Sequence, residues 1–186
     1  MEQDIEKSLQ VLRHGGVILY PTDTVWGLGC DATNEEAVAK IYRIKQRSDS
    51  KALIVLAADM GQVKQYALNV DEKLIQFLQQ VPKPTTVIYE QAYSLAKNLL
   101  ADDGSIAIRL CEEPFCQQLL NKFSKPIVST SANISGMPAP SCFRDISENI
   151  KNKVDYVVQY RQADNTPHAP SAIVRWKAGE IEVLRT

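Results

Sequence analysis

Short apolar runs separated by amphipathic stretches constrain the fold of this chain more than any other feature. Residues 17–20 and 52–57 are apolar runs of strand length. Residues 3–14 and 33–47 carry apolar side chains at helical spacing, and the second of these helices opens on a capping box that begins at Thr33. Helices and strands therefore alternate through the first part of the chain, which is typical of an α/β fold.

The end of the chain has a different pattern. Residues 171–176 and 180–185 flank Lys177-Ala178-Gly179 and predict a β-hairpin. With the earlier alternation, this hairpin predicts a mixed α/β sheet with flanking helices. No internal repeat or linker divides the chain, so we expect one domain over residues 1–186. The other expected elements are two helices within 59–80, helices over 92–100, 113–123 and 141–151, and strands over 85–89, 105–110, 126–128 and 154–158.

The composition indicates a globular protein and argues against a general nucleic-acid binder. Apolar residues make up 45% of the chain, charged residues 23%, and the formal net charge is −1. General nucleic-acid binders usually carry a strong positive excess. Any site for a polyanion must therefore be a local cluster of cations.

Cysteine usage and the N-terminus predict a cytoplasmic protein without a metal site. Cys111 and Cys116 are five positions apart, which is not the spacing of a zinc knuckle, and the chain has only two histidines. The acidic, polar N-terminus does not resemble a signal peptide, and no apolar run approaches the ~20 residues of a bilayer span. We therefore expect free thiols, a reducing cytoplasm and no membrane contact.

The densest group of cations is Lys45-Gln46-Arg47, followed by Lys51. Three cations within seven positions, beside an apolar strand, can hold a ligand with several negative charges. Cations in the last turn of a helix can also be plain complements of the helix dipole. The ligand interpretation gains weight because a helix and a strand anchor this short loop at both ends.

A second polar stretch runs from Ser129 to Gly136 and lies between Pro126 and Pro138. Its hydroxyls, amide and backbone N–H groups could bind phosphate or ribose oxygens. The same residue types also make ordinary solvated turns. We expect this stretch to meet the Lys45–Lys51 cations across one cleft that binds a nucleoside triphosphate.

Two further features are ambiguous by themselves. Residues 21–31 form a polar, glycine-containing loop after a strand, where α/β sheets often place ligands, but the full dinucleotide fingerprint is absent. Arg109 interrupts the apolar run 105–110. A buried arginine needs a partner or a ligand, whereas an arginine near a strand end can reach solvent; both interpretations stay open.

Taken together, these segments resemble the Sua5/YrdC family. The resemblance covers nearly the whole chain and is carried by Tyr20-Pro-Thr-Asp-Thr-Val-Trp-Gly-Leu-Gly29, by Lys45-Gln-Arg47, by the Arg109 strand, and by Ser131-Ala-Asn133 with Ser135-Gly136. It implies an α/β fold with a twisted mixed sheet and flanking helices around a concave, locally positive cavity. It also implies the short bacterial form, without an additional C-terminal domain.

The resemblance implies a reaction as well. The family condenses L-threonine, bicarbonate and ATP to threonylcarbamoyl-adenylate and pyrophosphate, and Mg²⁺ is expected to accompany ATP. A partner transferase complex then moves the threonylcarbamoyl group to N6 of adenosine 37 in tRNA. Weak direct contact with tRNA is compatible with this resemblance.

The family's site residues carry over by motif. Lys45 and Arg47 would act in catalysis through the ATP phosphates. The ATP-binding residues would be Arg47, Lys51, Arg109, Asn133, Ser141 and Arg185. The threonine-binding residues would be Thr24, Ser131 and Ser171. The chain departs from the family pattern at Ser48, at Ala52-Leu53 and at Val81-Pro82-Lys83-Pro84, while it keeps these charged and hydroxyl residues.

Three rival functions remain open on the sequence. The first is a non-catalytic RNA-binding module that uses the same cations. The second is a hydrolase with Cys30 or Ser131 as its nucleophile, although the sequence offers no clear base. The third is a related enzyme that makes a different acyl or carbamoyl adenylate.

Overall fold

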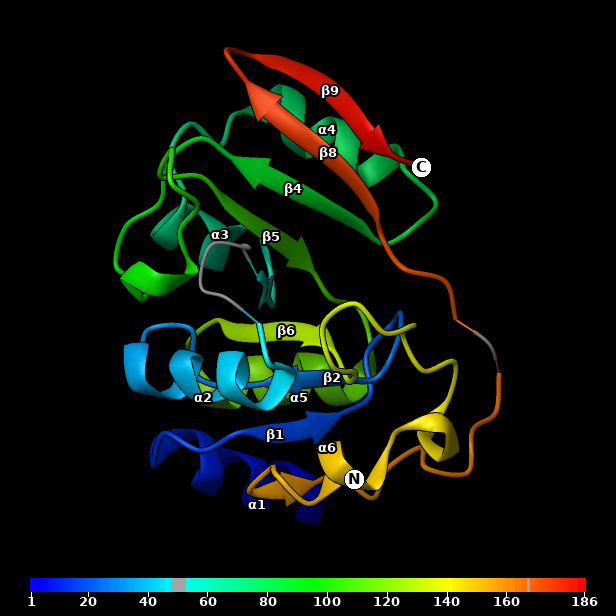
Figure 1. Cartoon of the computed structure of the whole chain (residues 1–186). Helices are drawn as coiled ribbons and strands as arrows, with labels where there is room; N and C mark the ends of the chain where they lie inside the picture. The colour runs from blue at the N-terminus through cyan, green and yellow to red at the C-terminus, as the bar shows by residue number, and fades with distance from the viewer. Residues whose placement is uncertain (48–52, 167) are drawn as a thin grey trace.

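In the computed structural model, described for residues 1–47, 53–166 and 168–186, the chain builds one mixed sheet with helices on both sides (Figure 1). The strands are β1 (Ile18–Tyr20), β2 (Gly27–Gly29), β3 (Ile54–Ala57), β4 (Thr85–Tyr89), β5 (Ile106–Leu110), β6 (Ile127–Ser131), β7 (Tyr156–Val157), β8 (Ala172–Lys177) and β9 (Glu180–Arg185). Among the described residues the sheet order is β7-β1-β2-β6-β3-β5-β4-β8-β9. The predicted mixed α/β sheet is therefore confirmed.

Helices cover the sheet, and capping side chains fix where some of these helices begin. They are α1 (Glu2–Arg13), α2 (Glu35–Lys45), α3 (Met60–Tyr66), α4 (Glu72–Gln80), α5 (Pro114–Phe123), α6 (Glu148–Lys151) and the 3₁₀ turns η1 (Lys97–Leu99) and η2 (Phe143–Asp145). Asn34 caps α2 by accepting from the Ala37 N–H at 3.1 Å, and Glu113 caps α5 in the same way.

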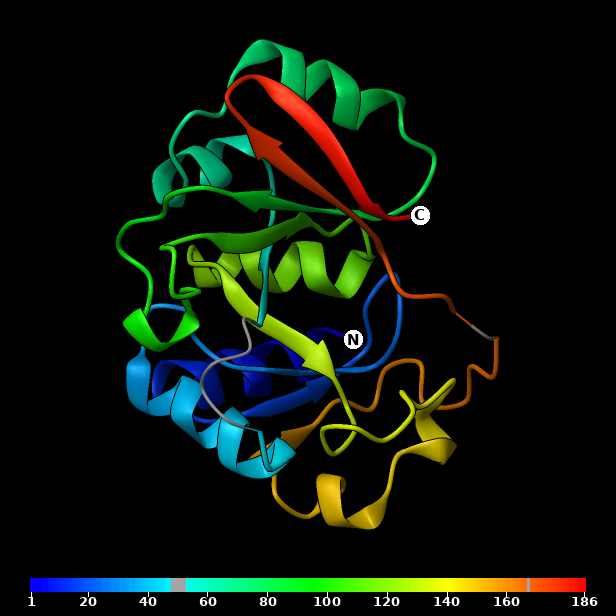
Figure 2. The ribbon, with the colours of Figure 1, turned by 45° about the horizontal axis from the view of Figure 1, so that its top comes forward.

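The sheet twists strongly along its length. In Figures 1 and 2, β1, β2 and β6 lie in one half of the molecule, and β4, β8 and β9 cross the other half at a different angle. The helix α4 lies beside the β8–β9 hairpin in both views, where Lys73 donates to the Gly179 carbonyl at 2.7 Å. Near the middle of the sheet, β3 pairs parallel with β5 and antiparallel with β6. The apolar run at Leu53 and β3 is almost wholly buried there.

Several elements differ from the prediction, including β6, which continues through Ser131 although the polar loop was expected to begin at Ser129. Gly27–Gly29, expected as loop, is a strand between β1 and β6. The expected helix over 92–100 is only the turn η1, and the one over 141–151 is broken into η2 and α6 at Ile146, whose backbone is extended (φ −72°, ψ 125°). The sequence misled at β2 because glycines and polar neighbours are typical of loops.

The glycines of β2 have a packing reason. A Cβ on Gly29 would lie 2.6 Å from a ring carbon of Tyr20 and 2.9 Å from the Val128 carbonyl oxygen. Tyr20 is 1% exposed and its hydroxyl donates to that same carbonyl. Gly29 therefore lets a large aromatic ring cross the strand face.

No helix in the described residues is long and apolar enough to cross a bilayer.

Candidate active site

One face of the sheet carries a cavity of about 520 Å³. Seven of the residues expected at a ligand site line it: Thr24, Arg47, Arg109, Ser131, Asn133, Ser171 and Arg185. They come from separate loops and strands, from residue 24 to residue 185. Strand alternation explains why side chains such as Thr86 and Arg109, direct partners in the β4–β5 register, share this face.

The cavity is positive. Its described lining includes three arginines and no carboxylate. Arg47 is half-buried, and burial lowers its pKa from the usual arginine value. Gln46 takes a left-handed conformation (φ 50°) that ends α2, so the chain turns between Lys45 and Arg47.

Arg109 is buried, paired and at the cavity wall at the same time. It is 4% exposed, and its Nη2 lies 2.9 Å from Oδ1 of Asp23. Its Nε–H, also buried, has no acceptor among the described residues. The solvent-exposed interpretation of Arg109 is therefore wrong. Sequence reasoning missed Asp23, although it is the only acid in the polar loop between β1 and β2.

The C-terminal hairpin reaches the cavity through Ser171 and Arg185. Nε and Nη2 of Arg185 donate to the Ser171 carbonyl at 3.0 and 2.7 Å. The Ser171 hydroxyl lies 2.8 Å from that of Thr86, which also lines the cavity. Sequence reasoning missed Thr86. The available signal was strand alternation, which places Thr86 on the same face as Ile88, another residue of the lining.

Lys45 meets the second polar stretch, but not as a bare cation at the cavity wall. It is 2% exposed, and its ammonium donates to the Ser131 and Asn133 carbonyls, the latter at 2.8 Å. It also lies 3.4 Å from Oδ1 of Asn133. Burial, and secondarily Arg47, lowers its pKa to about 8. The ammonium thus holds the loop that lines the cavity, and direct contact with a phosphate stays a prediction.

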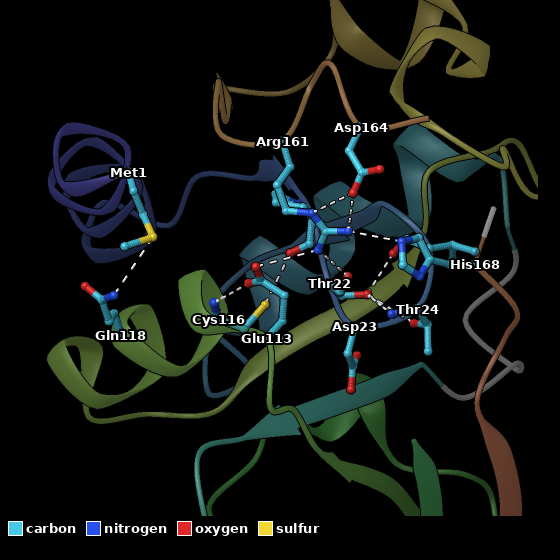
Figure 3. Close-up of polar contacts among 12 residues, drawn as sticks. Met1, Thr22, Asp23, Thr24, Glu113, Cys116, Gln118, Arg161, Asp164 and His168 are labelled. Carbon is cyan, nitrogen blue, oxygen red and sulfur yellow. Dashed lines mark hydrogen bonds and ion pairs between the residues drawn. The ribbon is translucent and has the colours of Figure 1, made fainter. Parts of the chain in front are cut away.

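Thr24 is fixed by a compact turn. Its N–H donates to Oγ1 of Thr22 at 3.1 Å, and the two hydroxyl oxygens also lie 3.1 Å apart. The Thr22 hydroxyl in turn donates to the Val25 carbonyl at 2.8 Å. Figure 3 shows Thr22 and Thr24 beside each other, above Asp23.

Besides Lys45, two expected site residues are not among the described residues that line this cavity. Ser141 is exposed and lines a small neighbouring hollow with Trp26 and His168, which shares only Thr24 with the described lining of the cavity. Lys51 lies outside the described residues. Within residues 1–47, 53–166 and 168–186, no group of three or more His, Cys, Asp or Glu side chains is arranged to hold a metal ion.

These features define a class: an α/β protein whose sheet presents an arginine-lined, hydroxyl-rich cavity of small-molecule size. The Sua5/YciO/YrdC family model, described as "Telomere recombination", matches residues 10–186. The chain belongs to this family.

Individual relatives agree with this membership. The chain is 33% identical over 186 residues to threonylcarbamoyl-AMP synthase of Vibrio cholerae, covering 98% of this chain and 97% of that one. It is 36% identical over 154 residues to the Psychromonas ingrahamii protein of the same name, covering 81% of each. Its fold matches P. abyssi Sua5 complexed with L-threonine at a TM-score of 0.87 and 23% identity, over 100% of this chain and 54% of that one.

Proposed function

We propose that the chain is a threonylcarbamoyl-AMP synthase, which condenses L-threonine, bicarbonate and ATP to threonylcarbamoyl-adenylate and pyrophosphate. One observation carries the proposal: seven residues that are distant in sequence line a single positive cavity. The names of the full-length relatives support the same activity. As in the family, the product would pass to a transferase complex that modifies tRNA in the cytoplasm.

The three arginines would bind the triphosphate. Guanidinium groups form charge-assisted, often bidentate hydrogen bonds to phosphate. The buried Nε–H of Arg109 has no acceptor in the described part of the chain, so a ligand oxygen would relieve an unsatisfied donor. Asn133 offers polar atoms to the nucleotide from the loop that Lys45 holds.

The hydroxyl-bearing part of the lining would bind the amino acid. Thr24, Ser131 and Ser171 line the cavity, and hydroxyls can both donate to a carboxylate and accept from an amine or a hydroxyl. The P. abyssi protein has been seen with L-threonine, which supports this assignment.

Charge repulsion is the main barrier that the cavity must lower. The amine of threonine and bicarbonate first give a carbamate and water. A carbamate oxygen then attacks the α-phosphorus of ATP, the bond to the bridging oxygen breaks, and pyrophosphate leaves with the electron pair. Because both reactants are anions, arginines on the phosphates reduce their repulsion and stabilise the leaving group. Holding the carbamate in line supplies the rest.

Magnesium would enter as part of the MgATP substrate. The described lining contains no carboxylate, so phosphate oxygens and water, and not this chain, would hold the ion. Its contribution when bound is to neutralise phosphate charge.

The rival functions find less support in the cavity. The described lining contains no aromatic residue on which RNA bases could stack, and the net charge is −1. Cys30 is fully buried, and burial raises the pKa of its thiol, which disfavours a nucleophilic thiolate. Ser131 lines the cavity, but neither histidine does so among the described residues.

Pyrophosphate release from MgATP with bicarbonate tests the proposal. We expect release with L-threonine, less with L-serine and little without an amino acid. Equal release with and without threonine would reject the synthase. Preference for another amino acid would indicate a different carbamoyl adenylate, and tight, steeply salt-dependent RNA binding without release would favour the RNA-binding module.

A further inference from the structure

Arg161 connects three segments that meet beside the Thr22–Thr24 turn (Figure 3). It follows β7 at a left-handed backbone position (φ 64°), and its side chain is 21% exposed. Its Nε and Nη2 donate to Oδ2 of Asp164 at 3.1 and 2.8 Å. These bonds orient the guanidinium so that its other edge faces the loop between β1 and β2.

The other edge of the guanidinium has two partners. Nη1 of Arg161 donates to the Thr22 carbonyl at 3.3 Å and lies 3.6 Å from Oε1 of Glu113. Glu113 is 5% exposed, and its second carboxylate oxygen caps α5 by accepting from the Cys116 N–H at 2.9 Å. Arg161 thus compensates a buried carboxylate and holds the start of the loop at once.

The loop is also held by α5. The Cys116 thiol donates to the Pro21 carbonyl at 3.2 Å. Pro21 and Thr22 are therefore fixed by neighbouring groups on α5 and by Arg161, while Nη2 of Arg161 also contacts Nε2 of His168 at 3.0 Å. The position of the Thr22 side chain follows from that of its backbone.

The hydrogen bonds of Thr22 determine the direction of the Thr24 hydroxyl. A hydroxyl has one proton to donate, and that of Thr22 goes to the Val25 carbonyl. The Thr24 hydroxyl must then donate to Oγ1 of Thr22. This leaves the lone pairs of the Thr24 oxygen, at the cavity lining, free to accept from an N–H or O–H of a ligand.

We propose that Arg161 is a positioning residue for the amino-acid end of the cavity: by holding the Thr22 carbonyl, it keeps the Thr24 hydroxyl oriented as an acceptor for the amino-acid substrate. This inference rests on the proposed function. Arg161 itself does not line the cavity and does not act on the reacting atoms.

Kinetics of Arg161→Gln test the proposal. We expect the KM for L-threonine to rise about tenfold, the scale of one lost hydrogen bond, while the KM for ATP changes less than twofold. Arg144→Gln is the matched control, because Arg144 is 75% exposed and its nearest carboxylate lies 3.8 Å away; it should leave both KM values unchanged.

A double mutant tests the route through Thr22. Thr22→Val removes the hydroxyl that accepts from Thr24, so Arg161→Gln should add little to the threonine KM in that background. Additive effects, or equal increases in both KM values, would overturn the proposal. If Arg161→Gln unfolds the protein, Arg161→Lys takes its place, because lysine keeps a positive charge beside Glu113. The same changes in the two KM values then support or overturn the proposal. Failure of the synthase proposal would appear separately, as wild-type protein without threonine-dependent release.

Discussion

Lys45 and Arg47 are two positions apart and have different surroundings. The left-handed Gln46 turns the chain between them, so Arg47 lines the cavity while Lys45 is buried against the Ser131–Asn133 backbone. One short cationic motif therefore provides both a ligand-facing charge and a support for the opposite loop. The sequence showed the cations but not this division, because it depends on a single backbone angle.

Substitution of the two cations should separate these roles. Arg47→Ala and Lys45→Ala should each lower pyrophosphate release at least roughly tenfold, the scale of one charge-assisted contact. Lys45→Ala should also cost roughly 1–3 kcal/mol of unfolding free energy, since two part-buried carbonyls lose their donor. Steady-state kinetics and urea unfolding measure both quantities. Two folded variants with wild-type turnover would remove these residues from the site.

Lys45 also predicts a pH dependence of stability. Its pKa is lowered to about 8 in the folded protein from 10.5, so between these values the unfolded chain binds more protons. The free energy of unfolding therefore gains a term that rises with pH from about 8 to 10.5. Urea unfolding at about pH 8 and pH 10.5 should show that the unfolding free energy of the wild type rises relative to that of Lys45→Met, which has no titrating group at this position. Parallel curves for the two proteins would contradict the lowered pKa.

At the scale of elements, the sequence predicted most helices and strands but misjudged β2. Apolar runs such as 52–57 and the C-terminal hairpin are local signals, and the structure confirms them wherever it describes them. The predicted capping box is one residue out of place, because Asn34 and not Thr33 caps α2. The strand Gly27–Gly29 depends on the neighbouring strands β1 and β6 and on the Tyr20 ring. Pairing partners that are distant in sequence leave no local pattern.

Gly29→Ala tests the close crossing of β2 and Tyr20. The new methyl group would meet the ring at 2.6 Å and a carbonyl at 2.9 Å, so we expect a loss of roughly 1–3 kcal/mol in unfolding free energy. Gly27→Ala is the control, because its nearest neighbour is the Ser129 hydroxyl at 3.1 Å. Thermal or urea unfolding should rank Gly29→Ala well below Gly27→Ala, and equal stabilities would contradict this account.

At the scale of the whole molecule, the sheet brings together site residues that lie far apart in the chain. The resemblance to a family named these residues one by one, whereas the residues alone suggested a triphosphate cleft between the Lys45–Lys51 cations and the Ser129–Gly136 stretch. Neither route identified Asp23 or Thr86, because their roles depend on the contact with Arg109 and on strand register. Residue chemistry is visible in a sequence, but the distance between two side chains is not.

Ligand-dependent stabilisation tests the assembled cavity. A ligand at 100 times its Kd raises the unfolding free energy by about 2.7 kcal/mol. MgATP should raise the Tm more than AMP does, because AMP lacks the two outer phosphates that the arginines would bind. In Arg47→Ala this difference should shrink, while Arg144→Gln should behave as wild type. Equal stabilisation by ATP and AMP in the wild-type protein would place the phosphates elsewhere.

The cavity lining extends from Thr24, beside the second strand of the chain, to Arg185, at the end of the ninth. Loops must close over most of the chain before these two residues line one cavity, so the site is among the most non-local features that folding has to build. In a nascent chain the lining is therefore complete only after β9 has emerged from the ribosome. We therefore expect substrates to bind and stabilise the finished fold rather than an early folding intermediate.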